Sequence, residues 1–131
     1  MPWFVLALVL LAGLSWLMTR VGRIAPADAR RLLAEGACVI DVRSAVEFAS
    51  NPLPGTLNIP LDTLEAHIAG RIPDKNTPLL LHCQSGGRSG IATQLLQRMG
   101  YARAFNLGSL SDARAILTRT SPRQPGSLPD E

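Results

Sequence analysis

The sequence is poor in the residues with which proteins bind nucleic acids, metals and cofactors. It has only six aromatic residues (two Trp, one Tyr and three Phe), and no run of basic residues is interleaved with them. The net charge of +3 is too small to indicate a nucleic-acid partner. No group of His, Cys, Asp or Glu has the spacing of metal ligands, and no nucleotide-binding loop is recognisable. We therefore expect no nucleic acid, no metal and no cofactor.

Cysteine is also scarce, with only Cys38 and Cys83. Cys38 comes early in a predicted strand that ends near Asp41, whereas Cys83 closes a strand of its own. In neighbouring parallel strands, which rise about 3.3 Å per residue, this offset places the two sulfurs too far apart for a disulfide. We expect Cys38 to be a small core residue. The absence of a disulfide is consistent with a reducing compartment.

Charge is absent from the first 18 residues, in which Ser15 is the only clearly polar side chain. As a helix this segment is about 27 Å long, slightly less than the roughly 30 Å of a bilayer's hydrocarbon core. Trp3 and Trp16 lie near its two ends, where aromatic rings settle at a membrane interface, and Arg20 follows. The pattern predicts a transmembrane helix over residues 1–20 and a linker over residues 21–25.

The orientation of this anchor is predicted from the basic residues around it. They lie only on its carboxyl side: Arg20, Arg23, Arg30 and Arg31. The positive-inside rule therefore places the following domain in the cytoplasm. The alternative is a cleaved secretory signal peptide, which would place the domain in the periplasm. That reading lacks both a basic residue before the apolar run and a small-x-small cleavage site after it.

The most informative stretch is residues 79–89, LLLHCQSGGRS. Its apolar start predicts a buried strand that ends at Cys83, Gly86 and Gly87 predict a turn, and a helix pattern begins at Arg88. A cysteine between a strand and a helix start meets backbone N–H groups and the positive end of the helix dipole, which favour a negative charge. Cys83 is therefore predicted to ionise readily and to act as a nucleophile.

The spacing Cys83-x4-Arg88 resembles the active loop of the rhodanese family. Protein phosphatases use a longer Cys-x5-Arg loop to hold a tetrahedral phosphate. Residues 39–48, with Asp41-Val42-Arg43, are similar to the first strand, Asp-x-Arg turn and short helix of the rhodanese family. Residues 53–60, Gly100-Tyr101 and residues 106–110 resemble its later segments. The resemblance covers residues 26–118, which is a suitable length for one domain.

The order of predicted elements agrees with this resemblance. Strands are predicted at Cys38–Asp41, Thr56–Ile59, Pro78–Cys83 and Ala102–Phe105, and helices at 26–34, 61–69 and 88–99. Alternating strands and helices indicate an α/β fold with a parallel sheet. The resemblance implies a rhodanese-like three-layer fold, with helices on both faces of the sheet. Residues 119–131, rich in proline, are predicted to be a disordered tail.

The resemblance implies a sulfurtransferase that works through a persulfide on Cys83. Its thiolate would take the sulfane sulfur of a donor such as thiosulfate, and a thiol, cyanide or protein acceptor would then remove it. The loop expected to bind the substrate is Gln84, Ser85, Gly86, Gly87 and Arg88. Arg88 either binds the anionic part of the donor or braces the loop. Many members of the family that use thiosulfate have a basic residue at the position of Gln84, so thiosulfate is expected to be a poor donor.

Three residues outside the loop are assigned from their position. Asp41 and Arg43 are expected to support the site, with the carboxylate accepting loop N–H groups and Arg43 pairing with Glu47. His82 precedes the nucleophile directly, but adjacent strand residues point to opposite faces. A Cys-His dyad is therefore not expected.

Two other functions remain possible at this point. One is a persulfide carrier or sensor with little turnover of its own, which a non-basic Gln84 would suit. The other, less favoured by the short loop, is a phosphatase or arsenate reductase of related fold.

Overall fold

A parallel sheet of four strands lies at the centre of the computed structural model, which describes residues 2–20 and 22–119. The strands are β1 (Cys38–Asp41), β2 (Leu57–Asn58), β3 (Leu79–His82) and β4 (Ala104–Gly108). Their order in the sheet is β2-β1-β3-β4, and every neighbouring pair is parallel. The predicted parallel α/β fold is therefore confirmed.

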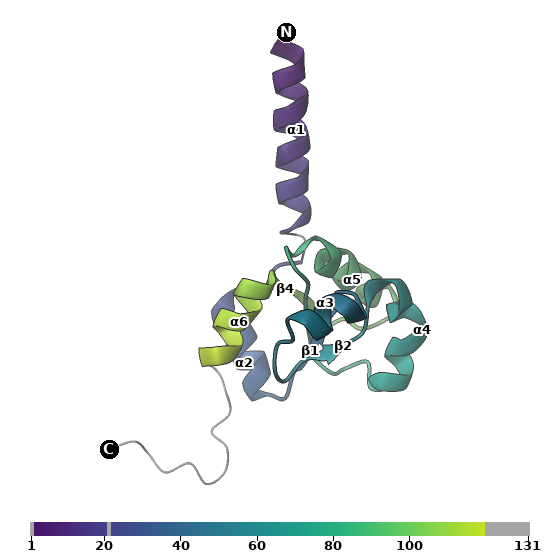
Figure 1. The fold of residues 1–131 in the computed structure, drawn as a ribbon. Coiled ribbons are helices and arrows are strands. Elements are labelled where there is room, and N and C mark those ends of the chain that lie inside the picture. The colour runs from purple at the N-terminus through teal and green to yellow at the C-terminus, as the bar shows by residue number, and fades with distance from the viewer. Residues whose placement is uncertain (1, 21, 120–131) are drawn as a thin grey trace, which may run out of the picture.

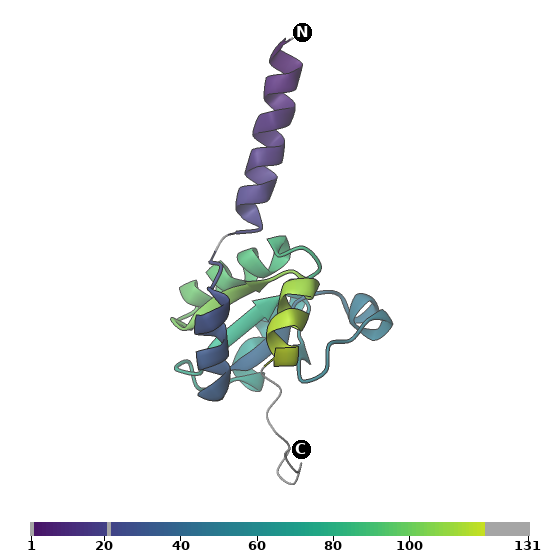
Figure 2. The same ribbon diagram turned by 90° about the vertical axis from the view of Figure 1, so that its left-hand side faces the viewer.

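Helices cover both faces of this sheet (Figures 1 and 2). They are α2 (Pro26–Ala34), α3 (Ala45–Ser50), α4 (Leu61–Arg71), α5 (Gly87–Arg98) and α6 (Leu110–Arg119). Ile40, Leu79 and Leu81 form one core with residues of α4 and α5. Val39 and Leu80 form a second core with residues of α2 and α6. The alternation follows from the pleat, which turns successive side chains to opposite faces.

The register of the strands brings distant parts of the sequence to one edge of the sheet. Asp41 at the end of β1 pairs with His82 at the end of β3, and His82 pairs in turn with Gly108 at the end of β4. Ligands of open parallel sheets bind at this carboxyl edge. The turn after Asp41 and the loop that begins at Cys83 therefore meet there.

The observed elements differ from the predicted ones mainly near the end of the domain. β1 has its predicted bounds, but β4 begins two residues later than expected and continues to Gly108. Pairing explains this shift, because Leu79 lies opposite Ala104 and His82 lies opposite Gly108. α6 begins directly after Ser109, in a segment for which no helix was predicted. Of the tail predicted for residues 119–131, Arg119 belongs to α6, and positions 120–131 lie outside the described residues.

The first helix, α1 (Pro2–Met18), extends away from the sheet and the other helices (Figure 1). It has 17 residues, and none of them is buried. In the part of the chain that the structure describes, no helix is both long and apolar enough to cross a membrane. The transmembrane helix predicted over residues 1–20 is thus not supported: 17 helical residues reach only about 26 Å, against roughly 30 Å of hydrocarbon.

Candidate active site

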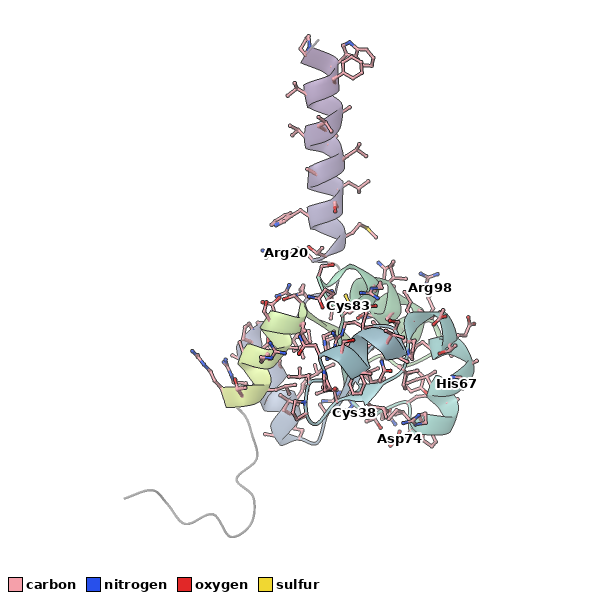
Figure 3. The ribbon with its side chains drawn as sticks, viewed as in Figure 1. Arg20, Cys38, His67, Asp74, Cys83 and Arg98 are labelled. Carbon is pink, nitrogen blue, oxygen red and sulfur yellow. The ribbon has the colours of Figure 1, made fainter. Side chains whose placement is uncertain are left out.

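Cys83 lies directly after β3, at the carboxyl edge of the sheet and before the first turn of α5. Its backbone N–H donates to the carbonyl of Gly108, at 3.3 Å, which ties the start of the loop to the end of β4. The residue is 1% exposed and belongs to the core on the α4 and α5 side of the sheet. Figure 3 shows Cys83 at the end of the domain from which α1 extends, near Arg20.

Hydrogen-bond donors surround the sulfur of Cys83. The backbone N–H of Gly86 donates to Sγ at 3.0 Å, and the backbone N–H of Ser89 at 3.4 Å. The hydroxyl of Ser89 lies 3.5 Å from the same sulfur. The loop therefore curls its N–H groups around Sγ, as the glycine-rich sequence predicted. Ser89, however, lies one residue beyond the predicted loop.

The environment of Cys83 favours its ionised form. Burial is the largest single influence on the pKa of Cys83 and raises it, because a buried charge is poorly solvated. Hydrogen bonds act the other way: those from the hydroxyl and backbone of Ser89 come first, followed by those from the N–H groups of Gly86 and Ser85. Together they lower the pKa of the thiol below its ordinary value. The predicted easy ionisation thus has a specific cause in four donors.

Gly86 has a backbone that other residues rarely adopt. Its φ is +99°, and a Cβ atom built on it would lie 3.0 Å from the carbonyl oxygen of Thr19. Gly87 differs, because it has no positive φ and no atom lies within 4 Å of its would-be Cβ. Of the two glycines that the sequence placed in the turn, only Gly86 is therefore required by the geometry.

Asn106 in β4 connects the loop to the segment that follows α1. Its side-chain oxygen lies 2.7 Å from the Ser89 hydroxyl, whose single proton is shared between this oxygen and Sγ of Cys83, and it accepts from the Gly108 N–H at 3.0 Å. Its amide group donates to the carbonyl oxygens of Gly86, at 3.1 Å, and Thr19, at 3.4 Å. Asn106 is fully buried, so these contacts hold the two residues that donate to Cys83.

Arg88 is held by Glu47 of α3. The two guanidinium nitrogens lie 2.6 Å and 2.9 Å from the two carboxylate oxygens, a bidentate pair. The hydrogen bond from Arg88, followed by the backbone N–H of Ser44, lowers the pKa of Glu47 to about 2. The expectation that Glu47 pairs with Arg43 is wrong, because the Glu47 carboxylate is turned to α5. Of the two roles considered for Arg88, this contact corresponds to bracing the loop.

Asp41 and Arg43 form a buried ion pair beside the loop. The Arg43 guanidinium contacts the Asp41 carboxylate at 2.8 Å, and the backbone N–H of Arg43 donates to the same carboxylate at 2.9 Å. Arg43 also donates to the backbone carbonyls of Glu47 within α3 and of Asn51 directly after it. Asp41 is fully buried and Arg43 is 1% exposed. The pair thus shapes the turn between β1 and α3, as a supporting role requires.

The remaining candidates take no direct part in the geometry around Sγ. His82 is fully buried, and burial is the main reason that its pKa is lowered, so the ring is neutral near pH 7. Cys38 lies at the opposite end of β1 from Asp41, and both cysteines are free thiols. Burial raises the pKa of Cys38, which makes it the less reactive thiol.

A cavity of about 330 Å³ opens at the same edge of the sheet. It is lined by Val42, Ser44, Pro60, Leu61, Asp62 and Arg88. Val42 packs in the same core as Cys83, and Arg88 closes the loop that starts there. The cavity is thus a suitable place for a small donor next to the loop. Among residues 2–20 and 22–119, no three His, Cys, Asp or Glu side chains are grouped to hold a metal ion.

Sequence reasoning missed two residues of this site, Ser89 and Asn106, and one contact, that between Glu47 and Arg88. A signal existed for the first two, since Ser89 falls in the first turn of α5 and Asn106 is a polar residue within an apolar strand. The partner of Glu47 had no such signal, because Arg88 lies 41 residues further along the chain.

Comparison with known proteins gives one family. Residues 25–114 match the model of the rhodanese-like domain. The thiosulfate sulfurtransferase PspE of Escherichia coli is 38% identical over 73 residues, which cover 56% of this chain and 70% of that protein. The thiosulfate sulfurtransferase GlpE of Pseudomonas savastanoi is 32% identical over 90 residues, covering 69% of this chain and 83% of that protein.

Solved structures agree with these relatives. A human single-domain sulfurtransferase superposes with a TM-score of 0.60 and 34% identity, covering 70% of this chain and 94% of that one. A rhodanese of E. coli gives a TM-score of 0.56 and 36% identity, covering 59% of this chain and 91% of that one. With the fold, the family match and these relatives in agreement, the chain belongs to the rhodanese-like domain family, as a sulfurtransferase of the rhodanese type.

Proposed function

We propose that this protein transfers a sulfane sulfur through a persulfide on Cys83. The observation that carries the proposal is the set of donors aimed at Sγ, which lower the pKa of this thiol. A thiolate is the nucleophilic form of cysteine, and the same donors suit the anionic persulfide that would replace it.

The proposed first step uses thiosulfate, the substrate in the names of several relatives. The Cys83 thiolate attacks the outer sulfur of thiosulfate and forms an S–S bond. The original S–S bond of thiosulfate breaks, and sulfite leaves with the electron pair. In the second step an acceptor thiolate or cyanide attacks the outer sulfur of the persulfide, which restores the Cys83 thiolate.

Arg88 is proposed to act in this reaction as a brace rather than as the main anion-binding group. Both ends of its guanidinium fork are occupied by Glu47. The donor anion would then be held by the loop N–H groups at the cavity beside Val42 and Leu61. Because Gln84 adds no charge there, we expect a high KM for thiosulfate.

Intact mass spectrometry tests the persulfide directly. After exposure to thiosulfate or a mercaptopyruvate-type donor, the native chain should gain one sulfur atom and Cys83→Ser should gain none. Cys38→Ser is the matched control, because it removes the other thiol and should still gain one sulfur. A gain that persists in Cys83→Ser contradicts the assignment. Persulfide formation without turnover toward cyanide or a thiol would assign a carrier role in place of an enzyme.

We also propose that α1 attaches the domain to a membrane, on the cytoplasmic side. Support comes from its 17 residues without a charge, all of them exposed, and from the arginines that follow. The cytoplasmic leaflet is negatively charged and attracts such basic segments. Carbonate-resistant sedimentation with membranes, and protease access only after the cytoplasmic side is opened, would support this placement. A mature chain that begins after residue 18 would instead indicate a cleaved leader and a periplasmic domain.

A further inference from the structure

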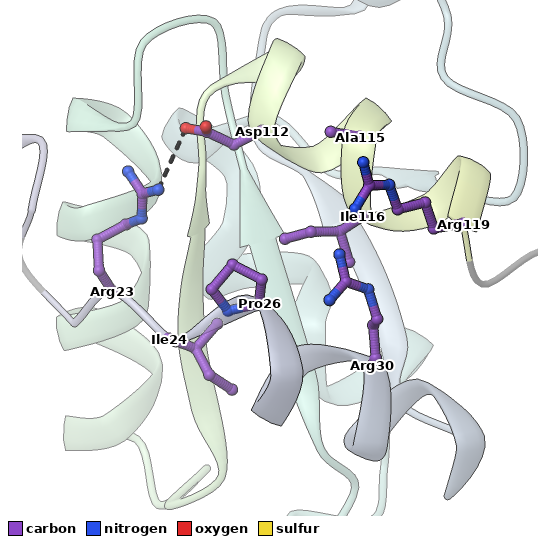
Figure 4. Close-up of a pocket in the computed structure, with 8 residues that line it drawn as sticks. All are labelled: Arg23, Ile24, Pro26, Arg30, Asp112, Ala115, Ile116 and Arg119. Carbon is purple, nitrogen blue, oxygen red and sulfur yellow. Dashed lines mark ion pairs between the residues drawn. The ribbon is translucent and has the colours of Figure 1, made fainter.

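A second cavity, of about 220 Å³, lies on the other face of the sheet from the core that contains Cys83 (Figure 4). It is enclosed by α2, α6 and the segment that joins α1 to α2. The lining residues are Arg23, Ile24, Pro26, Arg30, Asp112, Ala115, Ile116 and Arg119. This cavity shares no lining residue with the one beside the catalytic loop.

Positive charge is in excess around this cavity. Three arginines line it, against a single carboxylate. Arg23 and Asp112 compensate each other, because they form an ion pair at 3.2 Å. Arg30 and Arg119 form no ion pair within residues 2–20 and 22–119, and Figure 4 shows both guanidinium groups reaching into the same opening. Two like charges at one opening repel each other, so an anion between them would be stabilised.

Arg30 also has a buried donor that lacks an acceptor. Its Nε atom is shielded from solvent and makes no hydrogen bond within the described residues. Buried polar groups are nearly always hydrogen-bonded, and leaving a charged donor unpaired is unfavourable. This unpaired donor is an observation independent of the charge count, and it points to a missing acceptor.

The rest of the lining is apolar. Ile24 contributes from the segment before α2, Pro26 from the start of α2, and Ala115 and Ile116 from α6. A guanidinium fork matches the oxygens of a phosphate or similar oxyanion, which it can hold with two parallel hydrogen bonds. The combination of free guanidinium groups with an apolar wall suits an oxyanion that carries an apolar body.

We propose that this cavity binds a phosphate group attached to an apolar body, with Arg30 and Arg119 as its ligands. The site is separate from Cys83, and the proposal does not depend on the sulfurtransfer mechanism. The ligand is either a soluble phosphate monoester or the headgroup of an anionic lipid. A lipid is considered because the segment that follows α1 lines the cavity with Arg23 and Ile24.

The first experiment measures binding of phenyl phosphate and inorganic phosphate to the full chain in a nonionic detergent, from the rise in the thermal unfolding midpoint. Arg30→Gln and Arg119→Gln should each weaken binding of phenyl phosphate by about tenfold or more, as expected for loss of a charged hydrogen bond. Arg31→Gln is the matched control. It is adjacent on α2 and removes the same charge, but Arg31 pairs with Asp28 on the surface.

The second arm identifies the source of the phosphate. We would measure how much of the full chain sediments with phosphatidylcholine vesicles, with and without phosphatidylglycerol. The difference between the two vesicles gives the contribution of the anionic headgroup to membrane binding, because α1 contributes to both. If the increase caused by phosphatidylglycerol is lost in Arg30→Gln but kept in Arg31→Gln, the ligand is a lipid headgroup. If only phenyl phosphate shows this dependence, the ligand is soluble.

Two results would overturn the proposal. One is that no probe binds the native chain. The other is an equal loss of binding in Arg30→Gln and Arg31→Gln, which would show that net charge and not the cavity is responsible. Any binding of phosphate by the Cys83 loop would be the same in the native chain and in the three arginine variants, so it does not affect the differences between them. Arg119→Gln, on a different helix, keeps the test valid if Arg30→Gln does not fold.

Discussion

At the scale of single residues, the reactivity of Cys83 depends on which donors reach its sulfur. The loop supplies backbone N–H groups through Gly86 and Ser89, and Ser89 adds its hydroxyl. The rest of the loop has less influence: Gln84 and Ser85 are exposed, and Ser85 acts on Cys83 only through its backbone N–H.

We expect Ser89→Ala to raise the pKa of Cys83, because a hydrogen bond to the thiolate is lost. The rate of alkylation by iodoacetamide at pH 7 should fall by about tenfold, and the pH profile should move to higher pH. The measurement is made in a Cys38→Ser background so that only Cys83 reacts. Thr93→Ala is the control. Thr93 lies one helical turn after Ser89, and its hydroxyl donates to the Ser89 carbonyl and does not contact the sulfur. An unchanged profile in Ser89→Ala would show that the backbone donors suffice.

Gly86→Ala and Gly87→Ala should behave differently although the residues are adjacent. At Gly86, the Cβ of an alanine would lie in close contact with the Thr19 carbonyl oxygen, and the alanine backbone would have to adopt a positive φ. We expect this to lower the free energy of unfolding by about 1–3 kcal/mol. At Gly87 the space is open, so the free energy of unfolding should change by less than about 1 kcal/mol. Urea denaturation gives both values, and alkylation of Cys83 reports the loop. Equal effects at the two positions would mean that the loop is not held as described.

At the scale of secondary-structure elements, an ion pair joins α3 to the loop, and hydrogen bonds join it to the turn after β1. Glu47 of α3 holds Arg88 of α5, and Arg43 after β1 donates to one carbonyl within α3 and to that of Asn51 after it. Ser44 starts α3 with a capping box in which the Glu47 carboxylate also takes part. α3 is therefore the element that connects the Asp-x-Arg turn to the cysteine loop.

Glu47→Gln and Arg88→Gln are expected to lower kcat to a similar extent, with little change in KM for thiosulfate. The physical reason is that each breaks the same brace, so the double variant should be no worse than either single one. A rise in KM confined to Arg88→Gln would show instead that Arg88 binds the donor.

The pair between Glu47 and Arg88 also makes stability depend on pH. The pKa of Glu47 is about 2 in the folded chain and about 4.3 in the unfolded chain. The stabilisation by this pair is therefore complete above about pH 5 and is lost as the pH falls through 2.

Arg43→Met should destabilise the fold strongly, by about 3–5 kcal/mol, because it leaves the Asp41 carboxylate buried and uncompensated. Arg103→Met is the matched control: it breaks the half-exposed pair with Glu35 and should cost less than about 1 kcal/mol. The free energies come from urea denaturation of each variant. A small loss for Arg43→Met would mean that water reaches Asp41.

At the scale of the whole molecule, α1 and the domain are connected through the catalytic edge of the sheet. α1 has no buried residue, but the segment after it runs beside β4. There Asn106 donates its N–H to the Gly22 carbonyl at 2.8 Å and accepts from the Ile24 N–H at 3.1 Å. The Thr19 carbonyl lies against Gly86. The linker is thus part of the catalytic region, whereas α1 itself is not.

Two truncations test this division. Removal of residues 1–18 should leave the thermal midpoint and the alkylation profile of Cys83 unchanged, because α1 buries nothing against the domain. Removal of residues 1–23 also deletes Thr19 and Gly22, two of the linker residues that Asn106 contacts. It should lower the midpoint and slow alkylation. Identical behaviour of the two truncated chains would contradict a role of the linker at the loop.

Short-range patterns in the sequence predicted the nucleophile and its loop, and they led to the family that the comparisons confirm. An apolar strand, a cysteine, two glycines and a helix start follow one another within residues 79–89, so short-range preferences are enough to specify them. The parallel sheet also followed, because alternating strands and helices leave few other arrangements. The length of β4 and the existence of α6 did not, since pairing with β3 and packing beside α2 decide them.

Which side chains meet across the fold depends on its three-dimensional packing. Ser89 and Asn106 are 17 residues apart, and Glu47 and Arg88 are 41 apart. Such contacts depend on the register of strands and the rotation of helices, which spacing along the chain does not specify. The same holds for Arg30 and Arg119, which meet at one cavity only because α2 and α6 cover the same face of the sheet.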